Sequence, residues 1–264
     1  MTPAPDNLSP TGTRADFHRG MFDLQASYLH HRLRREPWWG LDYAFGNFST
    51  FKSVCRLAPG VNMDLDDHGW RRQLAATWSF FETHREPSDR EAFVEHLRAD
   101  WLTRWLAAYP IFEKHLNEER YIGCFRYDFN PEKRVVHLHF QNTVAPASPF
   151  ANLEERRADL AAILQEIRTL AATAGHATPD TVHFDSWMNA LDPIKKLFPA
   201  EFRVTPSEEF PKGYGWWGQF IAKDGGLNAR RAQAFIETGK FEFPRQNGQC
   251  SWQAFIAQVP PNPA

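Results

Sequence analysis

The amino-acid sequence predicts an α+β or α/β protein, in which a mainly helical N-terminal half packs on a mixed β-sheet. Apolar side chains recur every three or four residues through most of 14–118, which is typical of amphipathic helices. Residues 121–189 instead hold two short β-prone runs joined by one amphipathic helical segment. We therefore expect a disordered arm at 1–13, a helical region at 14–118 and a mixed α/β region at 119–264 that carries the functional site.

Three helices are predicted in the N-terminal half. The first spans 15–36 and ends at Pro37, the second carries a stripe that includes Trp70 and Phe81, and the third begins at a capping box at Ser88–Glu91. Because proline lacks a backbone N–H, we expect Pro110 to interrupt the third helix. Glycine and proline in the segment 38–62 predict loops with one or two short strands.

The central segment predicts a β-hairpin followed by a βαβ unit. The hairpin turns at Asn130–Lys133, and a helix capped by Asn152 and closed by Gly175 leads to a strand at 181–187. Side chains alternate between the two faces of a strand, so the helix covers one face of both strands. The opposite face then carries the polar and aromatic side chains of His137, His139, Gln141, His183, Asp185 and Trp187.

The C-terminal part predicts shorter elements. Residues 192–197 form a short helix, 213–221 a glycine-spaced aromatic strand or loop, and 228–239 a helix between an asparagine cap and a closing glycine. A short docked helix around Trp252 precedes a frayed end.

Composition narrows the class of partner. A formal net charge of −2 over 264 residues favours neither a nucleic acid nor a membrane as partner. Three cysteines, odd in number and far apart, favour a reducing compartment. With no apolar leader or membrane-length apolar run, we expect a cytoplasmic protein with a small-molecule substrate. Ten tryptophans and 22 phenylalanines are explained first by an aromatic core.

The histidine-bearing face permits metal binding. Histidines two residues apart on one strand lie about 6.5–7 Å apart at the backbone, close enough to converge on one ion. His137 and His139, with His183 or Asp185 from the next strand, would form a three-ligand site for zinc or iron. Hydrogen-bonded structural histidines are the simpler alternative.

The same face permits general acid–base catalysis. A histidine oriented by an aspartate is a common proton-transfer group near neutral pH, and His139 or His183 with Asp185 would supply one. Motifs for other chemistries are absent: the sequence has no phosphate-binding glycine loop, no HExxH or CxxC metal motif and no G-x-S-x-G nucleophile elbow.

Residues 119–204 resemble a known family. The hairpin from Tyr121, the Leu138-His139 strand end, the following helix and the Ser186-Trp187 pair are similar to the C-terminal half of GNAT-like (N-acetyltransferase-related) acyltransferase domains. The resemblance implies a mixed sheet with crossing helices and acyl transfer from a thioester donor. Only His139 and the Ser186-Trp187 pair carry over, and the glycine-rich pyrophosphate loop of the family is absent.

We therefore expect a small-molecule enzyme that transfers an acyl group to an amine or hydroxyl acceptor. His139 would act as general base, with Asp185 and His183 beside it. Substrate contacts would come from the polar and aromatic residues Gln141, Asn142, Trp187, Asn189, Trp217 and Gln219. A zinc or iron enzyme using His137, His139, His183 and Asp185 is the first alternative, and a non-catalytic ligand-binding protein is the second.

Overall fold

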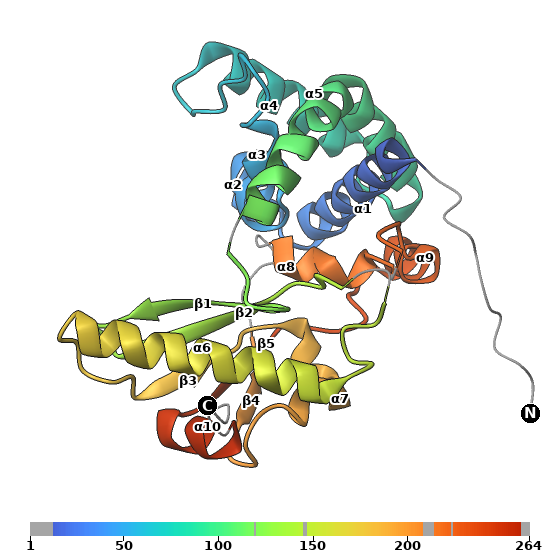
Figure 1. Ribbon diagram of the computed structural model, residues 1–264. Helices are drawn as coiled ribbons and strands as arrows, with labels where there is room; N and C mark the ends of the chain where they lie inside the picture. Colours follow the sequence, from blue (N-terminus) through green and yellow to red (C-terminus); the bar gives the residue numbers. More distant parts are fainter. Residues whose placement is uncertain (1–12, 119, 145–146, 208–213, 223, 260–264) are drawn as a thin grey trace, which may run out of the picture. The chain divides into compact units, whose positions relative to one another are not determined.

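The computed structural model describes residues 13–118, 120–144, 147–207, 214–222 and 224–259, so the expected N-terminal arm lies outside it except for Thr13. Across these residues the chain is an α+β protein with a five-stranded mixed sheet (Figure 1). It divides into two compact units. The helical unit comprises Met1–Leu116 and Phe210–Lys240, and the sheet unit comprises Asn117–Glu209 and Phe241–Ala264.

The helical unit is built on capped helices. Thr13 and Asp16 form a reciprocal capping box at the start of the first helix, and Asp67 caps the fourth. Gly239 ends the ninth in the left-handed conformation. The helices of this unit are α1 (Arg14–Arg35), α2 (Gly40–Asn47), α3 (Phe51–Cys55), α4 (His68–Thr83), α5 (Arg90–Glu118), α8 (Tyr214–Trp217) and α9 (Ala229–Thr238).

Aromatic side chains form the core of the helical unit, as the composition predicts. Trp70 and Trp101 meet edge to face with ring centroids 5.3 Å apart, and Phe51 lies against both Trp101 and Trp105. All four are buried, so these aromatics fill an interior and do not line a ligand pocket.

Three predictions for the helical unit are wrong. The segment 38–62 contains α2 and α3, with a 3₁₀ turn at Pro37–Trp39, where loops and strands were expected. Helix α5 continues through Pro110 to Glu118. The described part of the aromatic segment after residue 213 is a helical turn, α8, followed by the 3₁₀ turn Gly218–Phe220. In the segment 38–62 and in the segment after residue 213, tertiary packing outweighs the local preference of glycine for loops.

The sheet unit contains the predicted hairpin and βαβ unit. The strands are β1 (Phe125–Asn130), β2 (Val135–Phe140), β3 (Thr181–His183), β4 (Arg203–Pro206) and β5 (Gln246–Ser251). Their order is β1-β2-β3-β5-β4, and only the β2–β3 pair is parallel. Helix α6 (Leu153–Thr173) connects β2 to β3, and Figure 1 shows its axis roughly aligned with the arrows of β1 and β2. The predictions missed β4 and β5.

The two faces of this sheet differ in chemistry. Val136, Leu138 and Val182 point into a core shared with α6 and α10 (Trp252–Gln258), and the short helix α7 (Asp192–Lys195) adds Ile194. His137, on the opposite face of β2, is exposed. The predicted alternation of β2 and the placement of α6 on its apolar face are therefore confirmed.

The residues 210–240 group with the helical unit, although we expected them in the mixed α/β region. Trp217 packs edge to face on Tyr28 of α1, and Phe235 lies against both rings. These contacts join segments far apart in the sequence, which is why local patterns did not reveal the grouping.

No described helix is both long enough and apolar enough to cross a lipid bilayer.

Candidate metal-binding site

Two histidines lie side by side at the centre of the polar face. The parallel register of β2 and β3 places His137 directly beside His183, and their ring centroids are 5.1 Å apart. Neither imidazole makes a side-chain hydrogen bond to another residue that the structure describes. The two rings are therefore brought together by the strand register and not by a hydrogen bond between them or to a neighbour.

Asp185 completes a three-residue group. It follows β3 and lies two residues beyond His183, so it emerges on the same face. One ligand atom from each of His137, His183 and Asp185 lies within 4.8 Å of the other two. Oδ1 of Asp185 is buried and has no hydrogen-bond partner among the described residues, which is costly for a carboxylate oxygen.

The surroundings favour the neutral form of His183. Burial lowers the pKa of His183 below its usual value, and the adjacent His137 lowers it further, while Asp185 opposes the shift. A neutral imidazole keeps a lone pair for a metal ion, so the environment suits His183 as a ligand.

His139 lies outside this three-residue group. Its Nε2 is 2.7 Å from Oδ2 of Asp128, which comes from β1, and the other oxygen of Asp128 accepts a hydrogen bond from Arg126 at 3.1 Å. Asp128 therefore takes the place beside His139 that the sequence analysis assigned to Asp185. The alternation of β1 hinted at it, because Asp128 is opposite His137 once the hairpin register is known.

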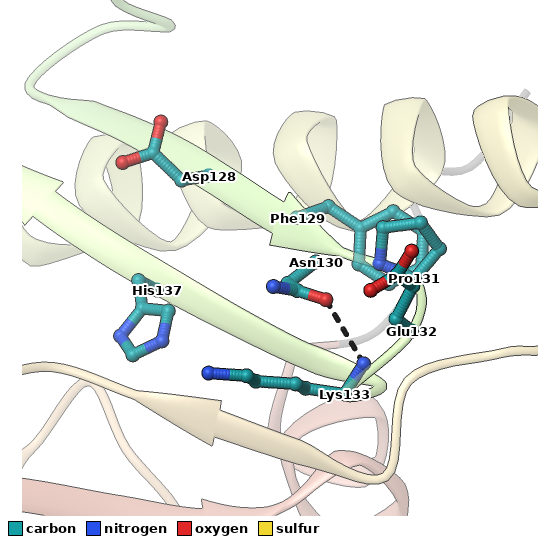
Figure 2. Close-up of a pocket in the computed structure, with 7 residues that line it drawn as sticks. All are labelled: Asp128, Phe129, Asn130, Pro131, Glu132, Lys133 and His137. Atoms are coloured by element: carbon teal, nitrogen blue, oxygen red, sulfur yellow. Dashed lines mark hydrogen bonds between the residues drawn. The ribbon is translucent and has the colours of Figure 1, made fainter.

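An open hollow of about 460 Å³ adjoins His137 at the hairpin (Figure 2). His137 forms one side of it, and the remaining lining residues all belong to the hairpin: Asp128, Phe129, Asn130, Pro131, Glu132 and Lys133. The turn was predicted from the sequence, whereas the hollow was not.

Four other predicted site residues have structural contacts in the sheet unit. Trp187 stacks on Phe243 and packs against the core. Asn189 is buried, and its side-chain amide donates to the carbonyls of Phe184 and Gln246 at 2.6 and 3.1 Å. Asn142 accepts from the Val144 backbone N–H. The backbone N–H of Gln141 donates to the Cys124 carbonyl.

Trp217 and Gln219, which were predicted to contact the substrate, belong to the helical unit. Both are buried there. Trp217 packs among Tyr28, Phe220 and Phe235, and the Gln219 amide donates to the Trp216 carbonyl at 3.2 Å. Their burial in this interior explains the aromatic segment without a ligand.

The chain was compared with models of protein families, with curated proteins and with solved structures, and no significant match was found in any of the three.

Proposed function

We propose that the sheet unit binds a divalent transition-metal ion through His137, His183 and Asp185, and that the protein is a metal-dependent enzyme. The observation that carries the proposal is that the three ligand atoms lie within 4.8 Å of one another. One of the three side chains, Asp185, also has a buried oxygen with no hydrogen-bond partner in the described part of the chain. A cation at this point would provide the missing partner of Asp185 Oδ1.

The ligand set selects the kind of ion. Two imidazoles and one carboxylate suit zinc or ferrous iron, and a three-ligand site leaves coordination positions for water or substrate. When bound, a zinc ion would act as a Lewis acid that polarises a substrate oxygen, and an iron ion would provide a centre for redox chemistry. His137 and His183 come from the paired strands and Asp185 from just beyond β3.

Elemental analysis of the purified full-length protein tests the metal site. We expect about one zinc or iron ion per chain. His183→Ala and Asp185→Asn should each weaken Zn²⁺ affinity by more than the roughly 10- to 100-fold that loss of an outer-shell partner causes. His139→Ala is the matched control, because His139 lies on the same face but pairs with Asp128, and it should retain the metal. Absence of zinc and iron, together with no Zn²⁺ binding by calorimetry, would refute the proposal.

Acyl-group transfer is the second candidate function, and the observation that favours it is the contact between His139 and Asp128. In this alternative Asp128 orients the ring of His139, which accepts the proton of an amine or hydroxyl acceptor. The test measures thiol release from acetyl-coenzyme A with a panel of amine acceptors. Removing a general base typically lowers the rate about 10²- to 10⁴-fold, so His139→Ala should show a loss of that size. No thiol release by the wild-type protein, or equal rates for both proteins, would exclude it.

A further inference from the structure

The side chain of Lys133 extends along the hollow toward His137, one of the three candidate metal ligands. Lys133 and His137 both line the hollow, and in Figure 2 the lysine side chain runs from the turn toward the His137 ring. No described residue forms an ion pair with its ammonium group. The hollow therefore presents a positive charge that is not neutralised by a neighbouring described residue.

Asn130 adds a hydrogen-bond donor of fixed orientation. Its Oδ1 accepts a hydrogen bond from the backbone N–H of Lys133 at 2.9 Å. Because a backbone N–H can only donate, this contact identifies the amide oxygen, and the Nδ2 group must point the other way. In Figure 2 that nitrogen lies on the side of the hollow that faces His137. The turn thus aims an N–H donor into the same space as the ammonium group.

The two carboxylates in the lining do not cancel this arrangement. Asp128 is already held by His139 and Arg126, at 2.7 and 3.1 Å. In Figure 2 the carboxylate of Glu132 points toward Pro131 and away from His137. The lining groups left to contact an anionic ligand are therefore the Lys133 ammonium, the Asn130 amide and His137, which is also one of the three candidate metal ligands.

We propose that the hollow binds the oxyanion of a small substrate, either a carboxylate or a phosphate group, between Lys133, Asn130 and the metal ion. This inference rests on the proposed metal-binding function, and it names the class of substrate. Charge-assisted hydrogen bonds from lysine, and direct coordination by a divalent cation, are both suited to such a group.

The test uses the full-length protein loaded with Co²⁺, whose visible absorption reports on the ligands around the ion. The spectrum is titrated with inorganic phosphate and, separately, with acetate, and the anion that binds more tightly identifies the source of the oxyanion. We expect at least one titration to saturate with a changed Co²⁺ spectrum.

Three variants test the two donors. Lys133→Met removes the charge but keeps a long side chain, and it should raise the anion dissociation constant about tenfold or more, since a hydrogen bond to a charged group contributes at least that factor. Asn130→Asp keeps the oxygen that accepts from Lys133 N–H but replaces the donor by an anion, and it should weaken binding similarly. Lys240→Met makes the same change at an exposed lysine of the helical unit, so it is the matched control and should change the constant by less than about threefold.

The outcomes separate the two proposals. Absence of the Co²⁺ spectrum in the wild-type protein refutes the metal site and with it this inference. A normal Co²⁺ spectrum with no response to either anion, or with the same anion affinity in Lys133→Met and the wild type, refutes the oxyanion site alone. Co²⁺ affinity is measured for the wild type and the three variants, and it should be equal in all four proteins. Equal Co²⁺ affinity would show that a weaker anion response does not come from loss of the metal.

Discussion

The buried side chain of His30 couples the stability of the helical unit to pH. His30 is fully buried, its Nε2 lies 3.0 Å from the His84 carbonyl, and its ring packs on Phe81 and Phe93. Burial lowers the pKa of His30 to about 4. The unfolded chain would take up this proton near pH 6.5, so between pH 6.5 and 4 protons bind the unfolded chain more strongly than the folded one.

We therefore expect the free energy of unfolding to fall by about 3 kcal/mol, from this group alone, as the pH drops from about 6.5 to 4. Urea unfolding at pH 7, 5 and 4 measures it. His30→Phe should remove most of this slope, whereas His176→Gln, at an exposed position, should leave it unchanged. The same slope in His30→Phe and the wild type would show that other groups cause the acid sensitivity.

Two glycines with the same backbone conformation allow backbone strain to be separated from steric overlap. Gly123 and Gly175 have φ angles of 56° and 67°. A Cβ atom on Gly123 would overlap with the Asp159 carboxylate, whereas a Cβ atom on Gly175 would meet nothing within 4 Å. Asp159 also accepts from the Cys124 backbone N–H and pairs with Arg156, so it cannot move without losing both contacts.

Gly175→Ala should cost about 1 kcal/mol of unfolding free energy, the usual penalty for a left-handed alanine. Gly123→Ala should cost about 3 kcal/mol, because displacement of Asp159 also breaks buried polar contacts. Chemical denaturation of the two variants measures the difference. Equal losses would mean that the Asp159 side chain adapts at no cost.

At the scale of elements, Asn189 joins the segment after β3 to the start of β5. Its amide bonds to carbonyls on both segments. Asn189→Ala removes both of these hydrogen bonds from a buried position, while each carbonyl keeps its backbone donor, so the loss of two bonds should destabilise the sheet unit by about 2 kcal/mol. Asn247→Ala, at an exposed position of β5, should change stability by less than about 0.5 kcal/mol. If Asn189 acted only on a substrate, as the sequence analysis expected, unfolding of its alanine variant would match the wild type.

Local periodicity explains which elements could be predicted. The alternation of β2 and the asparagine cap of α6 are short-range signals, and both predictions were correct. Strand β5 has the sequence Gln-Asn-Gly-Gln-Cys-Ser, in which apolar and polar residues do not alternate. At the buried position Gly248 a side chain is missing, and Phe202 fills the space where its Cβ atom would lie. Its place between β3 and β4 depends on pairing with distant strands.

The candidate site was predictable to the same extent. A βαβ unit brings neighbouring strands together in parallel, so the sequence was enough to place His183 beside β2. The sequence did not show which histidine of β2 lies beside His183. The register of β2 and β3 places His137 there, and not His139. Asp128 and Lys133 depend on the hairpin register and on a turn in which Arg134 has φ of 54°, a conformation that the residue types do not indicate.

At the scale of the whole molecule, the candidate ligands all belong to one of the two units. A metal ion that binds only the folded state raises the free energy of unfolding. The increase grows with the logarithm of the ratio between the ion concentration and the dissociation constant. We expect saturating Zn²⁺ to slow amide hydrogen exchange in β2 and β3 and to leave α1 and α4 unchanged. Hydrogen exchange with mass spectrometry checks this, with Asp185→Asn as the control. Equal protection in both units would indicate binding elsewhere.

The position of β5 has a consequence for the order in which the chain emerges from the ribosome. The last of the described strands along the chain, Gln246–Ser251, is inserted between β3 and β4. Until it emerges, β4 has no described strand to pair with, and β3 has a partner on one side only. The described sheet is therefore completed only after Ser251 has been translated, and a nascent chain stalled before Gln246 would expose unpaired strand edges.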